Sequence, residues 1–135
     1  EVVGFGKSEM DDLIVSAAQA QGRRVEPDSS PEAGYFYRSD HLHFAQLGIP
    51  VLYTSNGIDL VEGGVARGQA LNAAYVANDY HKPSDEVTDA WDMSGGIEDL
   101  QLLYTVGRGL ADGTSWPRWR DNAEFRGARV ASGRN

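Results

Sequence analysis

The segment Tyr80–Asp85, which reads Tyr-His-Lys-Pro-Ser-Asp, constrains the fold of this chain more than any other stretch. Proline fixes its own φ, has no backbone N–H to donate, and biases the preceding residue toward extended geometry. A helix or strand therefore cannot continue through Lys82 and Pro83. We expect His81 to lie on a loop, where rigid scaffolds usually present binding and catalytic side chains.

Helix and strand patterns alternate along the rest of the chain. Short apolar runs at residues 2–5, 24–26 and 50–54 predict strands. Helical spacing of apolar residues follows Ser8 and Ser39 and recurs at residues 69–77 and 96–110. This alternation predicts an α/β fold with a mainly parallel or mixed sheet and helices on both of its faces.

Capping signals predict where these helices begin and end. Ser8 is expected to cap the first helix, with Asp11 completing a capping box and Gly22 ending the helix. Ser39 is expected to cap the second helix, which would run to Gly48. The last helix is expected to present one apolar stripe, made by Ile97, Leu100, Leu103, Tyr104 and Gly107. Residues 55–79 form a long, glycine-containing connection, which in a compact α/β unit usually carries function.

Composition excludes several classes of function. The net charge of −8 argues against a nucleic-acid partner, because neutralising phosphates needs clustered Lys and Arg. No apolar run approaches the roughly 18 residues of a membrane-spanning helix, so no membrane partner is expected. The chain has no cysteine, which excludes disulfides and thiolate metal sites. Its 135 residues suffice for one domain with a reasonable core.

A second motif lies upstream of the first. The segment Arg38–Phe44 reads Arg-Ser-Asp-His-Leu-His-Phe and is followed by Gly-Ile-Pro at Gly48–Pro50. The two motifs, in this order, resemble the C-terminal part of peptidase family 28. This superfamily of co-catalytic di-zinc aminopeptidases also contains the glutamate carboxypeptidases and the glutaminyl cyclases. The resemblance runs over about residues 1–119, and residues 120–135 are expected to form an irregular or flexible tail.

The resemblance implies a role for each motif. His81 would be a zinc ligand, and the phenol of Tyr80 would be a catalytic hydrogen-bond donor to the developing oxyanion. Four residues would bind substrate or support the metal ligands, namely Arg38, Asp40, His41 and Asp85. Each has a structural alternative: a surface histidine or arginine, a packing aromatic, or a carboxylate in a helix first turn or Asx-turn. His41 and His43 are two residues apart and face different sides of a helix, so His43 is expected to be structural or exposed.

The remaining elements of the family's site are absent from this sequence. The family's His-x-Asp, bridging Asp, Glu-Glu pair and later Asp have no counterpart here. We therefore interpret the chain as the C-terminal portion of a three-layer, zinc-aminopeptidase-like fold that hydrolyses peptides and carries two zinc ions. The isolated piece is expected to be inactive and to bind zinc weakly or not at all. Separated from the N-terminal part, it would expose a strand edge and an apolar face, which favours self-association.

Two other functions use the same scaffold. The first is acyl transfer of the glutaminyl cyclase type, and the second is a non-catalytic α/β binding or structural module. The cyclases favour Trp before the zinc-binding histidine, so Tyr80 favours a peptidase. A non-catalytic module would be expected to have lost His81 or Asp40, and both are present. The resemblance is compatible with export to a periplasm or outside the cell, and the substrate preference stays open.

Overall fold

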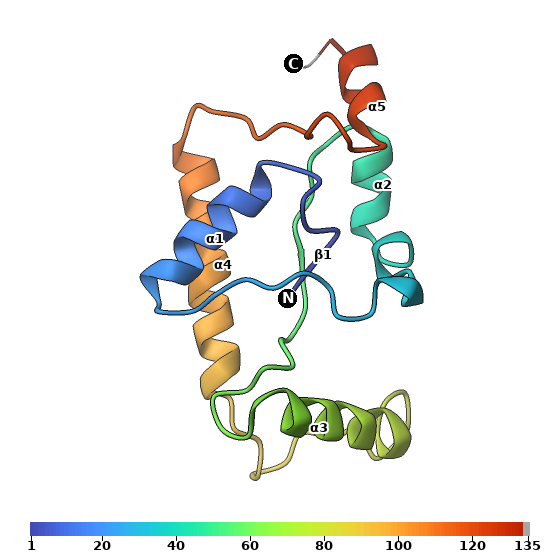
Figure 1. Ribbon diagram of the computed structural model, residues 1–135, viewed down its shortest axis with the longest axis vertical. Coiled ribbons are helices and arrows are strands. Elements are labelled where there is room, and N and C mark those ends of the chain that lie inside the picture. Colours follow the sequence, from blue (N-terminus) through green and yellow to red (C-terminus); the bar gives the residue numbers. More distant parts are fainter. Residues whose placement is uncertain (134–135) are drawn as a thin grey trace. The chain divides into compact units, whose positions relative to one another are not determined.

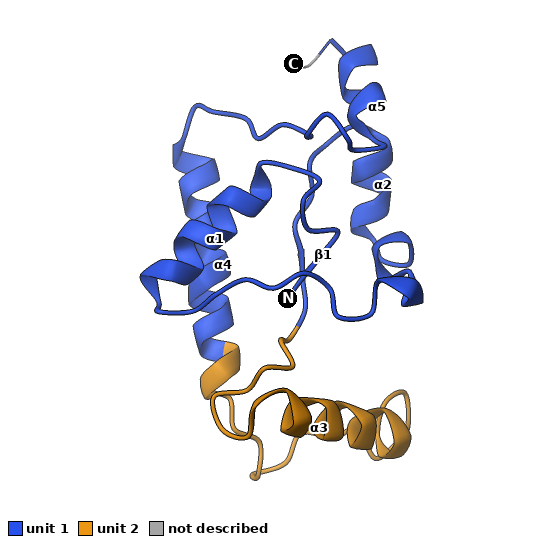
Figure 2. Ribbon diagram, in the orientation of Figure 1, with its two compact units in different colours: residues 1–55, 97–135 blue, residues 56–96 orange. Residues whose placement is uncertain are grey.

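The computed structural model describes residues 1–133, which divide into two compact units (Figure 2). Unit 1 combines Glu1–Ser55 with the chain from Ile97 onward, and unit 2 is Asn56–Gly96. Among the described residues, no helix is both long and apolar enough to span a membrane.

The sheet of unit 1 is small and antiparallel. β1 (Val2–Val3) pairs with β2 (Tyr53–Thr54), with Val2 opposite Thr54 and Val3 opposite Tyr53. The predicted strand at residues 24–26 does not form. Instead, Pro27 makes a single parallel bridge to Val2, and proline has no N–H with which to extend it. The chain thus combines helices with a two-stranded sheet, and the predicted mainly parallel sheet is not present in residues 1–133.

α1 (Met10–Ala20) packs on β1 through one face. Met10, Ile14 and Ala18 recur every four residues and are buried together with Val2. At the start of the helix, the Ser8 hydroxyl accepts a hydrogen bond from the Met10 N–H at 3.2 Å. The N-cap of α1 is Glu9 rather than the predicted Ser8, and the Asp11 carboxylate accepts from the Gly6 N–H at 2.8 Å. Burial of this carboxylate raises the pKa of Asp11.

α4 (Ser94–Asp112) lies beside α1 (Figure 1). It packs there through a different face from the predicted one. Leu102, Val106 and Leu110 face α1, again at a spacing of four. The sequence prediction chose the wrong stripe, because α4 carries two apolar stripes at helical spacing. The members of the predicted stripe are largely exposed: Ile97 is 52%, Leu100 68%, Leu103 38% and Tyr104 64% exposed.

A second apolar cluster holds α2 (His41–Gln46) and α5 (Arg126–Ala131) in unit 1. Its buried members are Val3, Phe36, Ala45, Trp119 and Ala123. Phe36 lies in the second of two short 3-10 helices, Pro31–Ala33 and Tyr35–Tyr37. The structure thus differs from the expectation of an irregular tail over residues 120–135: this range contains α5, and Ala123 is buried. Residues 134–135 lie outside the described part.

α1 and α2 end in the same way, at a glycine with left-handed backbone. Gly22 has φ 70° and Gly48 has φ 80°. After α2, the Gly48 N–H donates to the Ala45 carbonyl at 2.8 Å and the Ile49 N–H to the Phe44 carbonyl at 3.1 Å, a Schellman motif. The two glycines differ in their surroundings. A Cβ on Gly48 would lie 2.3 Å from the backbone nitrogen of Arg129, whereas nothing lies within 4 Å of one on Gly22.

Unit 2 is built on α3 (Gly64–Asn78), which begins earlier than the predicted helix at residues 69–77. Gly68 is its one buried residue, because the backbone of Ile58 crosses the helix there. A Cβ on Gly68 would lie 2.0 Å from the Ile58 carbonyl oxygen. The long connection predicted at residues 55–79 therefore contains α3, and the backbone of Ile58 crosses this helix at Gly68.

We expect Gly48→Ala to destabilise the chain more than Gly22→Ala. Both changes place a Cβ on left-handed backbone, which costs about 1–2 kcal/mol. Only Gly48→Ala also forces apart α2 and α5, and overpacking of this kind adds about 1–3 kcal/mol. Urea unfolding of the two variants measures the difference. Equal losses of unfolding free energy would show that the approach of Arg129 to Gly48 is not tight in solution.

Candidate functional site

The loop that carries His81 begins at the end of α3. The Asp79 and Tyr80 N–H groups both donate to the Tyr75 carbonyl, at 2.8 and 3.0 Å. The last carbonyls of a helix have no partner within the helix, so such bonds stabilise its end. The Tyr75 carbonyl, in the last turn of α3, thus binds the first residues after the helix.

The second half of the loop folds back onto the same helix end. The Lys82 ammonium donates to the Ala77 carbonyl, and the Ser84 hydroxyl donates to the Asn78 carbonyl at 3.0 Å. A cationic side chain at a helix C-terminus is also favoured by the helix dipole. The residues around Pro83 are therefore attached to α3 by their side chains, and the prediction of a loop at this place is confirmed.

His81 lies at the turn of this loop with φ 59°, the only positive φ of a non-glycine residue in residues 1–133. Histidine is among the residues that tolerate this conformation best, yet such backbone persists only where its surroundings enforce it. The imidazole is exposed and packs on the Tyr80 ring, with 4.0 Å between centroids. None of the described residues forms a hydrogen bond with either ring nitrogen, so both are open to a ligand.

Asp85 is held by Tyr75. The Tyr75 hydroxyl donates to the Asp85 carboxylate at 2.8 Å, and this bond raises the pKa of Tyr75, because a phenolate would face a carboxylate. Sequence reasoning considered Asp85 as a partner for His81 and did not single out Tyr75. The signal for Tyr75 was its spacing, since an aromatic residue five positions before Tyr80 can reach it across a helix end.

Arg38 and Asp40 lie in unit 1, and both are exposed. The Arg38 guanidinium stacks over the Tyr35 ring at 5.9 Å and makes a long hydrogen bond of 3.4 Å to the Ala33 carbonyl. Asp40, one residue after the predicted Ser39, is the N-cap of α2, and its carboxylate makes no capping bond. Both charged groups are therefore only weakly engaged by the described residues.

His41 has the opposite environment to His81. Its ring lies between Phe36 and Tyr53, with 4.8 Å to each ring centroid, and its Nε2 is buried without a partner among the described residues (1–133). Burial lowers the pKa of His41, and a hydrogen bond to the Phe36 backbone and the Asp40 charge offset part of this effect. The aromatic cluster around His41 therefore favours the neutral form of its ring. His43 is exposed, as predicted.

The predicted site residues are divided between the two units. Arg38, Asp40 and His41 lie in unit 1, whereas Tyr80, His81 and Asp85 lie in unit 2. Within residues 1–133, no three His, Asp or Glu side chains gather where they could hold a metal ion. A zinc site needs three or four protein ligands. Among residues 1–133, His43 and His81 are exposed imidazoles, and neither lies in a group of three side chains that could hold a metal ion.

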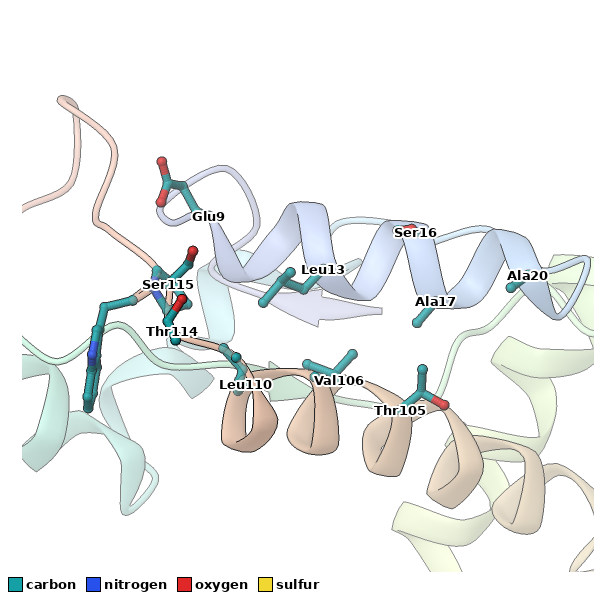
Figure 3. A pocket seen from close by; sticks show the side chains of 14 residues that line it. Glu9, Leu13, Ser16, Ala17, Ala20, Thr105, Val106, Leu110, Thr114 and Ser115 are labelled. Carbon is teal, nitrogen blue, oxygen red and sulfur yellow. The ribbon is translucent and has the colours of Figure 1, made fainter.

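Unit 1 also contains an open groove of about 510 Å³ along α1 and α4 (Figure 3). Its lining is mostly apolar and includes Leu13, Val106, Leu110 and Trp116. Glu9, its one carboxylate, is paired with Arg118 at 2.9 Å, which lowers the pKa of Glu9. None of the predicted site residues lines this groove. It therefore offers apolar contact area but no free acid or base.

The family model for Peptidase family M28 matches residues 2–105 of the chain. This match covers most of the sequence and includes both motifs, so the chain belongs to peptidase family M28. No curated protein and no solved structure matches it. The predicted family is thereby confirmed.

The half-buried imidazole of His41 predicts a pH-dependent stability. Because the pKa of folded His41 lies below its unfolded value of about 6.5, the unfolded chain binds the proton more readily. The contribution of the neutral His41 ring to the free energy of unfolding is thus fully present above about pH 6.5, and it is lost as the pH falls. His41→Phe keeps the aromatic packing and should remove this contribution in unfolding measurements between about pH 7.5 and pH 5.

The matched control is His43→Phe, because His43 is on the same helix and is exposed. This variant should retain the pH dependence of the unmodified chain. If both variants, or neither, changed the slope of stability against pH, the partial burial of the His41 ring would not be the cause of the pH dependence.

Proposed function

We propose that this chain is part of a zinc-dependent exopeptidase of the aminopeptidase type, to which it contributes one metal ligand and an oxyanion donor. Membership of peptidase family M28 supports hydrolysis of peptides in general. The observation that carries the finer proposal is His81: an exposed imidazole on strained backbone, with no hydrogen bond from the described residues. Neutral imidazole is the commonest side-chain ligand of metals in proteins.

The zinc chemistry needs groups beyond residues 1–133. A pair of zinc ions supplies an activated water and polarises the scissile carbonyl when bound. The other ligands and the general base would come from outside the described residues, because these gather no metal-binding cluster. The proposal therefore places this chain in a longer protein with the three-layer fold of the family, in which the exposed stripe of α4 would have a partner.

Tyr80 is proposed as the oxyanion donor. Its ring packs on His81, and its side chain is 48% exposed, so the hydroxyl is accessible to a substrate held at the imidazole. A hydrogen bond to the developing negative charge acts mainly in the transition state and contributes about 3 kcal/mol in well-studied hydrolases. Tyr80 would thus lower the barrier without contributing much to substrate affinity.

Arg38 and Asp40 are proposed to bind substrate or to support the metal ligands. The weak engagement of the Arg38 guanidinium, by one long hydrogen bond and a stacked ring, leaves most of its donors available. A guanidinium presents five N–H groups in a fixed plane, which suits carbonyl and carboxylate groups of a peptide. The Asp40 carboxylate is likewise without a capping bond.

The activity is tested in the full-length protein that contains this chain. His81→Ala should remove one zinc ligand, reduce the zinc content and abolish most turnover of aminoacyl substrates. Tyr80→Phe should lower kcat by about 100-fold while changing KM little, because an oxyanion donor acts in the transition state. Metal analysis and steady-state kinetics measure both effects.

His43→Ala is the matched control, since His43 is an exposed histidine on α2. It should keep normal zinc content and rate. Normal zinc content and rate in His81→Ala would instead mean that the loop is a structural turn. Release of a pyroglutamyl product without hydrolysis would assign the chain to acyl transfer rather than to peptidase action.

The isolated 135-residue chain should not bind zinc tightly. A lone imidazole lacks the two or three further ligands that a stable zinc site requires. Titration calorimetry with zinc should therefore show no stoichiometric, submicromolar binding. Detection of such a site would mean that side chains of this chain gather around the ion in a way that the described residues do not show.

A further inference from the structure

Tyr75 contacts both flanks of His81. On the N-terminal side, its carbonyl accepts from the Tyr80 N–H at 3.0 Å, and its ring lies 5.8 Å from the Tyr80 ring. On the C-terminal side, its hydroxyl donates to the Asp85 carboxylate at 2.8 Å. One residue of α3 thus holds the loop before and after the histidine.

Hydrogen bonds fix this loop: Tyr75 binds it in addition to the bonds that Lys82 and Ser84 donate to the end of α3. All residues from Tyr80 to Asp85 are exposed, so apolar burial does not select their conformation. The left-handed backbone of His81 is a conformation that non-glycine residues adopt only when their surroundings enforce it. Pro83 limits the backbone on one side, and the contacts of Tyr75 limit it on both.

We propose that Tyr75 is a positioning residue of the site: by binding Asp85 and packing on Tyr80, it fixes the direction in which His81 presents its imidazole. The inference rests on the proposed role of His81 as a metal ligand. Asp85 then acts through Tyr75, as the acceptor that holds the far end of the loop. The hydroxyl is the essential group, because the ring alone would contact only the Tyr80 side.

The test uses Tyr75→Phe in the full-length protein, which removes one oxygen and keeps the ring. In metal-free protein, amide hydrogen exchange in residues 79–85 should become about tenfold faster, because the loop is released at Asp85. The zinc dissociation constant, measured by competition with a chelator, should rise about tenfold, as is typical when a partner that orients a ligand is lost.

Two substitutions of Asp85 separate the hydrogen bond from other effects. Asp85→Asn keeps a neutral acceptor oxygen for the Tyr75 hydroxyl, so loop exchange and the zinc dissociation constant should change less than in Asp85→Leu. Asp85→Leu removes the acceptor and should reproduce Tyr75→Phe, and the double variant Tyr75→Phe with Asp85→Leu should be no worse than either single one. Equal effects of Asp85→Asn and Asp85→Leu, or additive effects in the double variant, would overturn the proposal.

Tyr104→Phe is the matched control, because Tyr104 is an exposed tyrosine on α4 whose hydroxyl accepts from Arg108 at 3.2 Å. It should change neither loop exchange nor zinc affinity. If Tyr75→Phe also left both unchanged while His81→Ala lost zinc, the positioning role would be wrong and the proposed function would stand. If His81→Ala kept its zinc, the proposed function would fail, and exchange in metal-free protein would still decide whether Tyr75 holds the loop.

Discussion

The contact between Trp119 and Gly48 joins the end of the chain to its middle, and the organisation of unit 1 depends on it. The indole N–H of Trp119 donates to the Gly48 carbonyl at 3.0 Å in a buried position, and Gly48 has no Cβ to keep α5 away. On either side of Trp119, the Glu9 N–H donates to the Arg118 carbonyl at 2.9 Å and the Arg120 N–H to the Lys7 carbonyl at 2.8 Å. With strands of only two residues, unit 1 gains cohesion from this segment and from two apolar clusters rather than from a sheet.

Unit 2 has no apolar core comparable to the two clusters of unit 1. Other interactions must therefore fix the loop that carries His81. Gly68 is the one buried residue of α3, and large apolar side chains such as Leu71 and Val76 are more than half exposed. The conformation of the His81 loop therefore depends on hydrogen bonds to the end of α3 rather than on burial. Exposed hydrogen bonds each contribute modestly, so the loop needs several of them together. This explains why Tyr75, Ala77 and Asn78 all accept bonds from it.

The sequence predicted the features that depend on local chemistry. The glycine ends at Gly22 and Gly48 follow from backbone preference, and the loop at Pro83 follows from the geometry of proline. The sequence did not predict which apolar stripe of α4 would be buried, because two stripes have helical spacing. Packing against α1 determines which of them is buried. The strand predicted at residues 24–26 does not form, because a strand also needs pairing partners, and the local sequence does not show whether they are present. Tyr75 was missed for the same reason: its role comes from a contact with Asp85 ten residues away.

The three histidines show how environment, rather than residue type, determines which group is available for chemistry. His41 lies in the Ser-Asp-His motif that resembles the family, yet its Nε2 is buried beside Phe36 and Tyr53, so an external metal cannot reach it without opening the cluster. An unsatisfied buried nitrogen destabilises the fold. The Nε2 atom of His41 therefore lowers stability and is not accessible to a ligand. His81 has exposed nitrogens and a restrained backbone, the two properties that a ligand needs. The two motifs thus contain one histidine that packs in an aromatic cluster and one exposed histidine, His81, which we propose as a metal ligand.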